Sequence, residues 1–331
     1  MATFLETVIA RLGKPKTIAL PEAPDSRMLE AAVRVTKAGW AKIVLVGNKD
    51  EIVKSAKDNG ARIDDIPIVE PATAPGLGAY CQEYWNLRGK GKPYNDDMAR
   101  KMMLEPLFFA AMMMRQGGAD GVVAGALNTT ANVVRAGIYI VKCAPGVNTI
   151  SSAFVMEHPN KEFGHEGKMI YADSGVIPDP TEDQLVDIAI ASADTARRLI
   201  GCEPRVAFLS FSTNGSAAHA MVDKMRHACE KTKARAPELL CDGEMQFDAA
   251  VMPKVAARKF LGSPVAGRAN VMIFPDLDAG NIGYKITERL GGANAFGPFL
   301  QGLAKPINDL SRGCNADDII TSIAVTSLQA G

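Results

Sequence analysis

The sequence predicts an α/β fold made of two domains with mainly parallel sheets. The first observation is length, because 331 residues correspond to two domains at ~150 residues each. The second is composition: 47% hydrophobic and 22% charged residues are typical of globular proteins with a large core. The third is the order of elements. Short apolar segments alternate with amphipathic segments, which is the pattern of a parallel sheet covered by helices.

The N-terminal part alternates most regularly. An amphipathic helix is predicted over 2–12, and Gly13 and Pro15 stop it. Ser26 is the expected N-cap of the next helix and Gly39 ends it. The β-α-β-α-β order that follows consists of a strand at 17–23, a helix at 26–39, a strand at 42–47, a helix at 49–60 and a strand at 66–71.

The pattern continues with a mainly helical region at 79–116, whose many methionines we interpret as core residues at helical spacing. A strand at 119–126 and a helix at 128–141 follow. Two extended segments, 148–156 and 168–176, lie so close in sequence that an antiparallel pair is predicted. The remaining expected elements are helices at 181–201, 217–233 and 247–260, strands at 206–213, 239–246, 269–276 and 295–302, and a loop within 279–292 that leads into a helix.

The central region contains enough elements for a sheet of its own. We therefore expect an outer domain of 1–145 plus 296–331, which includes the C-terminal segment, and an inserted domain of 146–295. Ligands of such folds bind near the carboxyl ends of strands. The active site is accordingly expected in the cleft between the two domains.

Charge and residue usage restrict the partners. Lys plus Arg and Asp plus Glu are balanced at 37 each, so no overall field attracts nucleic acid or an anionic membrane. No apolar run approaches the ~20 residues of a membrane span, and no secretory signal is recognised at the N-terminus. The six cysteines are scattered, which favours reduced thiols and a cytoplasmic location. The four histidines show no metal-binding spacing, so no metal is expected.

The densest polar stretch is KPINDLSRGCNADD, residues 305–318. It places Ser311 and Arg312 in a loop directly before the last helix. The local pattern favours a structural role, because Asn315 is a good N-cap and Asp318 stands at the third helical position, where its carboxylate can accept from the cap N–H.

Two other polar segments are candidate binding loops. Asn128, Thr129 and Thr130 follow a strand at an expected helix start, where backbone N–H groups favour an anion; plain capping would look the same. In AGNIGYK (279–285), glycines permit a close backbone approach. Asn281, Tyr284 and Lys285 are therefore candidate contacts to substrate, and turn chemistry explains them equally well.

Five sequence motifs follow one another along the chain: YADSGVIPDPTEDQLVDIAIASADTAR, VAFLSFSTNGSA, LLCDGEMQFDAA, ANVMIFPDLDAGNIGYK and GLAKPINDLSRGCNADD. Together they resemble the phosphate acetyltransferase (phosphotransacetylase) family, from about residue 17 to the end. The resemblance implies two α/β domains, one inserted in the other, similar to isocitrate and isopropylmalate dehydrogenases. It also implies the acetate-metabolism reaction acetyl-CoA + phosphate ⇌ acetyl phosphate + CoA, a homodimer, and no cofactor, since CoA is a substrate.

The resemblance also implies residue roles. Asp318 matches the carboxylate that takes the proton of the CoA thiol, and Ser311 and Arg312 match the pair that stabilises the oxyanion. Arg88 and Arg135 match arginines that bind CoA or phosphate, for which a planar guanidinium is well suited. An ordinary Asp with a pKa of ~3.9 is a weak base for a thiol with a pKa of ~8.5, so the site has to assist the proton transfer.

The chain departs from the family pattern at the anion loop. Relatives often have His-Ser-Thr-Ala-Asp and Arg-Pro where this chain has Asn-Thr-Thr-Ala-Asn and Arg135-Ala136. Acyl preference therefore stays open between acetyl and longer groups such as propionyl or butyryl. An alternative of another class is a non-catalytic module that senses CoA or acyl phosphate. A decarboxylating dehydrogenase would need a metal-binding aspartate set and a nucleotide loop, which we do not find.

Overall fold

The computed structural model describes residues 2–89 and 91–331 of the chain. They form two compact units. The first unit consists of Val8–Pro145 and Leu303–Gly331, and the second consists of Gly146–Gly302 together with the described residues up to Thr7. The chain therefore leaves the first unit and returns to it after the second, as an inserted domain does.

The first unit is built on a five-stranded sheet in the order β11-β4-β1-β2-β3. Every neighbouring pair is parallel, as the alternation of strands and helices predicts. The sheet combines strands from both ends of the chain. β11, near the C-terminus, pairs with β4 although the two strands are far apart in sequence. Their bounds are β1 Lys16–Leu20, β2 Ala41–Val46, β3 Ile68–Val69, β4 Gly121–Ala124 and β11 Ile307–Asp309.

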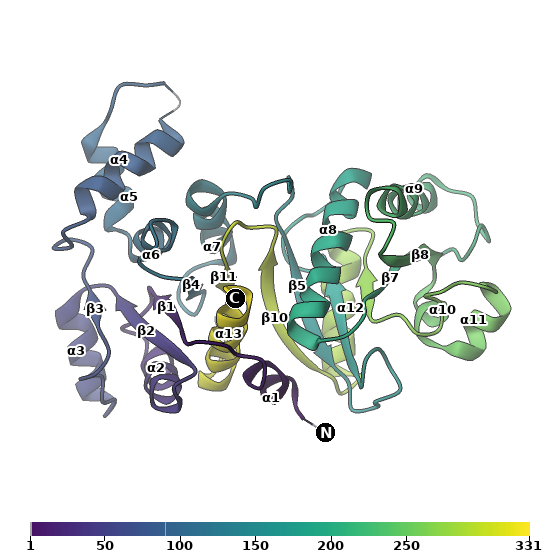
Figure 1. Ribbon diagram of the computed structural model, residues 1–331, viewed down its shortest axis with the longest axis horizontal. Coiled ribbons are helices and arrows are strands. Elements are labelled where there is room, and N and C mark those ends of the chain that lie inside the picture. Colours follow the sequence, from purple (N-terminus) through teal and green to yellow (C-terminus); the bar gives the residue numbers. More distant parts are fainter. Residues whose placement is uncertain (1, 90) are drawn as a thin grey trace. The chain divides into compact units, whose positions relative to one another are not determined.

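Helices cover both faces of this sheet. α2 and α13 pack side by side on one face, and α6 and α7 lie on the other (Figure 1). The N-cap of α2 is Asp25, which accepts from Arg27 N, so the expectation of Ser26 as cap was wrong by one residue. The helices are α2 Ser26–Ala38, α3 Lys49–Asp58, α4 Leu77–Arg88, α5 Asp96–Leu104, α6 Pro106–Arg115, α7 Thr130–Ala136 and α13 Ala316–Gln329, with a π-helical turn at Gly137–Val141.

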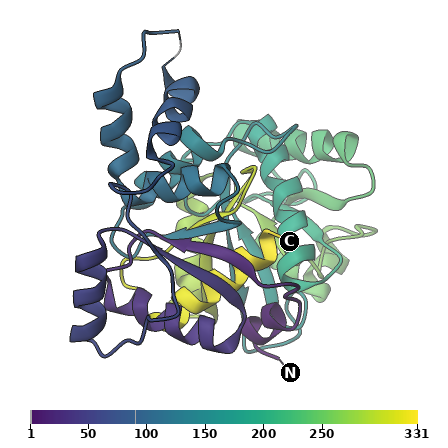
Figure 2. The same ribbon diagram turned by 60° about the vertical axis from the view of Figure 1, so that its left-hand side comes forward.

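The last helix, α13, begins with the predicted cap. Asn315 Oδ1 accepts from Asp318 N at 3.0 Å, and Asp318 Oδ2 accepts from Asn315 N at 2.9 Å. The two bonds satisfy backbone donors that the first turn leaves without partners. The rest of α13 is almost entirely buried against the sheet, and Figure 2 shows it in yellow beside the purple strands and helices of the N-terminal part.

The second unit contains a six-stranded sheet in the order β10-β5-β6-β9-β7-β8. β5 is antiparallel to both β10 and β6, which confirms the predicted antiparallel pair, while the remaining pairs are parallel. The strands are β5 Ser151–Glu157, β6 Lys168–Ala172, β7 Arg205–Leu209, β8 Leu240–Met245, β9 Val271–Ile273 and β10 Asn294–Gln301.

Two helix predictions in the second unit need correction. The segment 279–292 is not a loop at its start, because α12 already begins at Leu277, with Asp276 as its N-cap. The segment 247–260 forms two helices, since Pro253 cannot continue a helix and starts a new one. The helices of this unit are α8 Glu182–Thr195, followed by a π-helical turn at Ala196–Ile200, α9 Ala220–Arg235, α10 Phe247–Val251, α11 Pro253–Lys259 and α12 Leu277–Arg289.

The boundaries expected from the sequence differ from the observed units at two places. Residues 296–302 belong to the second unit because β10 pairs with β5 on both sides of an irregularity between Phe296 and Phe299. The first residues of the chain belong there too: Phe4, in α1 (Phe4–Ile9), packs on Phe296 and Phe299 of β10 with ring centroids 4.9 and 6.4 Å apart. Long-range strand pairing places residues 296–302 in the second unit, and aromatic contacts place the first residues of the chain there.

No helix within residues 2–89 and 91–331 combines the length and the apolar character that crossing a membrane requires.

Candidate active site

The carboxyl ends of β1, β4 and β11 lie next to one another in the first sheet. Because β11 pairs with β4 and β4 with β1, all parallel, the loops that follow these strands meet at one edge. These loops carry the polar residues of three distant parts of the chain. They are 21–25 after β1, 125–129 after β4 and 310–315 after β11.

The loop after β11 carries Ser311 and Arg312, and both residues are exposed. Ser311 Oγ accepts from Gly313 N at 3.3 Å. The guanidinium of Arg312 has no carboxylate partner among the described residues, and its backbone carbonyl accepts from Arg27 Nη1 at 2.8 Å. A hydroxyl and a guanidinium are thus exposed to solvent after a strand end, and both groups can donate hydrogen bonds to an oxyanion or a phosphate.

Asp318 lies one turn into the same loop–helix segment, and its carboxylate is exposed. The bond that Asp318 Oδ2 accepts from the Asn315 N–H confirms the capping role predicted for this residue. A carboxylate has lone pairs on both oxygens, so capping leaves acceptor capacity for a substrate proton. Asp317, its neighbour, instead pairs with Arg34 of α2 at 2.6 Å.

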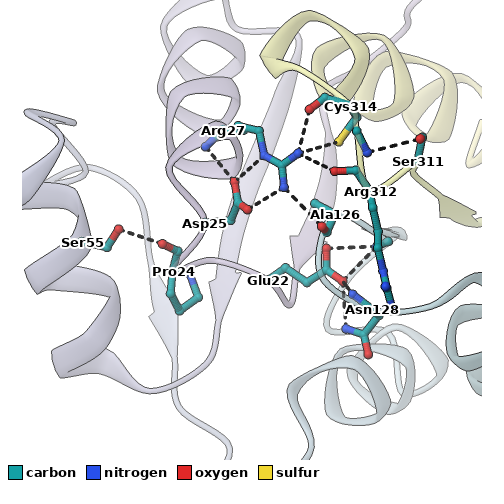
Figure 3. Close-up of polar contacts among 12 residues, drawn as sticks. Glu22, Pro24, Asp25, Arg27, Ser55, Ala126, Asn128, Ser311, Arg312 and Cys314 are labelled. Carbon is teal, nitrogen blue, oxygen red and sulfur yellow. Dashed lines mark hydrogen bonds and ion pairs between the residues drawn. The ribbon is translucent and has the colours of Figure 1, made fainter.

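Glu22, directly after β1, organises the loop after β4. Its carboxylate is buried and accepts from the backbone N–H of Gly125 at 3.0 Å, from Asn128 N at 2.7 Å and from Asn128 Nδ2 at 2.8 Å. Figure 3 shows the Glu22 carboxylate next to Asn128, with dashed lines to its donors. Glu22 is not recognisable from the sequence, because a single acidic residue after a strand carries no distinguishing pattern.

Thr129 and Thr130 lie at the start of α7, as predicted. Thr129 is the N-cap and accepts from Asn132 N at 3.2 Å. Thr130 Oγ1 donates to Asp309 Oδ2 at 2.6 Å, and Asp309 is almost fully buried at the end of β11. Burial, with the nearby charge of Glu22, raises the pKa of Asp309 to about 6, against the opposing effect of the Thr130 hydrogen bond.

Arg135 lies on α7 and is exposed, with its Nη1 donating to Asn132 Oδ1 at 2.8 Å. It lines a pocket of about 640 Å³ in the first unit. Lys101 adds a second cation to the wall. Apolar and polar side chains complete the lining: Pro21, Tyr84, Met98, Met102, Glu105, Pro106, Leu107, Phe108, Asn128 and Asn132.

The pocket revises the interpretation of the methionines. Met98 is 62% exposed and lines the pocket together with Met102, whereas Met103 and 112–114 are buried in the core as predicted. Arg88, at the end of α4, stacks its guanidinium over the ring of Tyr139 at 3.8 Å. A stacked guanidinium keeps its in-plane donors for a ligand.

The three remaining candidates belong to the second unit, on α12. Asn281 Nδ2 donates to the carbonyl of Ser174 at 3.2 Å. The ring of Tyr284 stacks on Phe154 at 4.0 Å and packs against the core cluster, while Lys285 is exposed beside it. Of the three, Lys285 is the most open to solvent, and Tyr284 has an evident packing role.

Comparison with known proteins matches the whole chain. A family model described as phosphate acetyl/butaryl transferase covers residues 3–327. The phosphate acetyltransferase of Acetivibrio thermocellus is 47% identical over 329 residues, which are 99% of this chain and 98% of that protein. The phosphate acetyltransferase of Thermoanaerobacterium thermosaccharolyticum is 49% identical over 329 residues, 99% of each.

Solved structures agree with these relatives. A phosphotransacetylase from Streptococcus pyogenes has a TM-score of 0.94 at 38% identity, covering 100% of this chain and 99% of that chain. A 4-hydroxythreonine-4-phosphate dehydrogenase from Burkholderia phymatum, 13% identical, has a TM-score of 0.54 and covers 96% of this chain and 99% of that chain. The second likeness concerns the fold alone and confirms the expected relation to dehydrogenase folds. Because the family model matches residues 3–327 and relatives of 47% and 49% identity match over nearly their full length, this chain belongs to the phosphate acetyl/butaryl transferase family.

Proposed function

We propose that the chain catalyses the reversible transfer of an acetyl group between CoA and inorganic phosphate: acetyl-CoA + phosphate ⇌ acetyl phosphate + CoA. The observation that carries this conclusion is its full-length similarity to proteins named phosphate acetyltransferase, at 47% and 49% identity. The chain is accordingly an acyltransferase.

Toward acetyl-CoA, the reaction begins with loss of the thiol proton of CoA to the carboxylate of Asp318. The thiolate then attacks the carbonyl carbon of acetyl phosphate while both substrates are bound. A tetrahedral intermediate forms, and its oxyanion is stabilised by the Ser311 hydroxyl and the Arg312 guanidinium; one such donor contributes ~10²–10³ in rate. Collapse of the intermediate breaks the carbon–oxygen bond and releases phosphate.

For CoA, we propose the pocket of about 640 Å³ in the first unit. Its lining supports this assignment, because Arg135 and Lys101 supply positive charge for phosphate groups and Met98 and Met102 supply an apolar wall. Arg88, held over Tyr139, and the exposed Thr129 and Thr130 are the further residues assigned to substrate binding. The sequence pattern adds three further candidates for substrate binding on α12, which are Asn281, Tyr284 and Lys285.

The proposal includes no metal or organic cofactor, since the steps above need only proton transfer and oxyanion stabilisation. Neither nucleic acid nor membrane is a proposed partner. We place the enzyme in the cytoplasm, where CoA esters are made and used.

A homodimer is proposed from the surface of the second unit. A pocket of about 500 Å³ there is lined mainly by apolar side chains, and several of them are exposed: Phe211, Met221, Phe247 and Ile286. Apolar patches of this kind mark protein–protein contacts. Sedimentation of the wild type and of Phe211→Glu tests it: the wild type should sediment as a dimer and the variant as a monomer.

The activity itself is tested with the purified chain, CoA and acetyl phosphate. Acetyl-CoA should form, and arsenate should replace phosphate and drive breakdown of acetyl-CoA. Comparing kcat/KM for acetyl-, propionyl- and butyryl-CoA decides the acyl preference, since one methylene is worth ~1–3 kcal/mol of pocket fit. If a folded sample neither forms acetyl-CoA nor breaks it down with arsenate, the chain is better explained as a non-catalytic sensing module.

A further inference from the structure

Arg27 occupies the point where the three loops at the carboxyl ends of β1, β4 and β11 meet. Its Nε and Nη2 donate to both oxygens of Asp25, at 2.9 and 2.7 Å. Nη2 also donates to the carbonyl of Ala126 at 3.2 Å. Nη1 donates to the carbonyls of Arg312 and Cys314, each at 2.8 Å. Figure 3 shows the guanidinium at the centre of these acceptors.

These contacts use every N–H of the guanidinium, since Nε has one hydrogen and each Nη has two. Arg27 consequently has no donor left for a phosphate, although it lies close to the candidate catalytic loop. Its side chain is 29% exposed. Its effect on the reaction must therefore pass through the groups it holds and not through the substrate.

Two of the groups it holds are the backbone carbonyls on either side of Gly313. Fixing the carbonyls of Arg312 and Cys314 restricts the peptide planes between them. Ser311 Oγ accepts from Gly313 N within the same turn. The side chains of Ser311 and Arg312 are exposed, so their directions depend on the backbone that Arg27 holds.

Only arginine can make this set of bonds. Three carbonyl oxygens from two loops converge on one cation, and a planar fork meets them together with a bidentate carboxylate. Asp25 holds the fork in place, and its own pKa is shifted: burial opposes ionisation, but the hydrogen bonds from Arg27 outweigh burial, so the pKa lies below its ordinary value. A lysine at this position would leave some of the carbonyls without a donor.

We propose that Arg27 is a positioning residue for acyl transfer: it sets the backbone of the 311–314 loop so that Ser311 and Arg312 point at the reacting carbonyl. This inference rests on the proposed function. It assigns no substrate contact to Arg27. Because CoA is assigned to a pocket that Arg27 does not line, the residue should affect the chemical step much more than CoA binding.

The first experiment measures kcat and the KM for CoA in the wild type, Arg27→Ala, Arg27→Lys and the matched control Arg34→Ala. Arg34 also lies on α2 and also reaches α13, but through the exposed side chain of Asp317. We expect kcat to fall about 100-fold in both Arg27 variants, the effect of a displacement of about 1 Å at a reacting group. The KM for CoA should change less than about threefold, and Arg34→Ala should remain within about twofold of the wild type.

The second experiment asks whether Arg27 acts through Arg312. In an Arg312→Ala background, Arg27→Ala should lower kcat by much less than it does alone, because residues that act as one unit are not additive. Millimolar guanidinium ion should restore part of the activity of Arg27→Ala, and methylammonium at the same concentration should not. Thermal melting of each variant reports whether the fold is retained.

The outcomes separate the two proposals. If the wild type transfers acetyl groups and Arg27→Lys, folded by its melting curve, keeps the wild-type kcat, the positioning role is wrong and the proposed function stands. Fully additive losses with Arg312→Ala, or a rise in the KM for CoA with unchanged kcat, also overturn it. A folded wild type without acyl transfer removes the proposed function, and this inference with it.

Discussion

The hydroxyl of Thr130 donates a 2.6 Å hydrogen bond to Oδ2 of Asp309. The hydroxyl belongs to an exposed residue at the start of α7, and the carboxyl is buried at the end of β11. Asp309 Oδ1 is buried without a hydrogen-bond partner among the described residues. A carboxyl in this setting holds its proton more tightly than one in water, because burial disfavours the charged form.

Stability should depend on pH through Asp309. Its pKa is raised from 3.8 to about 6 in the folded state, so its stabilising contribution is complete below the ordinary value and is lost as pH rises through 6. Each tenfold change in proton affinity corresponds to about 1.4 kcal/mol, which limits the effect to about 3 kcal/mol. The free energy of unfolding of Asp309→Asn, minus that of the wild type, should therefore rise between about pH 4 and about pH 7.

Urea titrations over this pH range measure that difference, and a difference that stays constant with pH would contradict the raised pKa. Thr130→Val supplies a directional check. The Thr130 hydrogen bond stabilises the charged carboxylate and lowers its pKa. Without it, the transition in stability should move to higher pH.

Gly125 should not tolerate a side chain. Its φ is +116°, and an added Cβ would overlap the Asp309 side chain and lie 2.6 Å from the Leu310 carbonyl. Gly125→Ala should therefore destabilise the protein by several kcal/mol, on the order of 3 or more, because strain and overlap add. Gly60→Ala is the control: φ is +67° there, but nothing lies within 4 Å, so only the conformational cost of about 1–2 kcal/mol is expected. Equal losses in the two variants would show that overlap with β11 contributes nothing.

Asp318→Asn should lower kcat by ~10²–10⁴, the usual contribution of a positioned acid or base. The amide oxygen of Asn can still accept from Asn315 N, so the helix cap and the melting temperature should change little. Asp317→Asn, which removes the carboxylate of the Arg34 pair, is the matched control and should keep the wild-type kcat. A wild-type kcat in Asp318→Asn would exclude it as the base and leave it with capping alone.

Arg135→Gln should weaken CoA binding. If a charge-assisted hydrogen bond to a phosphate is worth about 1.5–3 kcal/mol, the KM for CoA should rise about 10- to 150-fold, and less at high salt where charges are screened. Lys54→Gln, which breaks the exposed pair with Asp58 on α3, should leave the KM unchanged. Steady-state kinetics at low and high ionic strength measure both, and an unchanged KM in Arg135→Gln would remove this residue from the CoA site.

Local features of the fold were predictable from the chain because their causes lie within a few residues. The capping pair Asn315 and Asp318 is three residues apart, so its reciprocal bonds follow from helix geometry alone. Thr181, at the start of the helix predicted over 181–201, is the N-cap of α8 and exchanges the same reciprocal bonds with Gln184. The antiparallel pairing of β5 and β6 was predictable because a short polar connection joins them. The start of α12 was missed because glycines at 280 and 283 suggested a loop, whereas the Asp276 cap and the helix's packing decide in favour of a helix.

By itself, the sequence determined the alternation of strands and helices, the Asn315 and Thr181 caps, and the motifs that indicate the family. Only the tertiary structure decided which residues from distant parts of the chain contact the loops that carry these motifs. Glu22, Gly125 and Asp309 come together because β1, β4 and β11 are neighbours in the sheet, and Arg27 reaches Arg312 across 285 positions of the chain. No local pattern marks such residues, since each looks like an ordinary charge or turn until strand order places them in contact. The same holds for residues 296–302, whose membership in the second unit depends on hydrogen bonds to β5, far away in sequence.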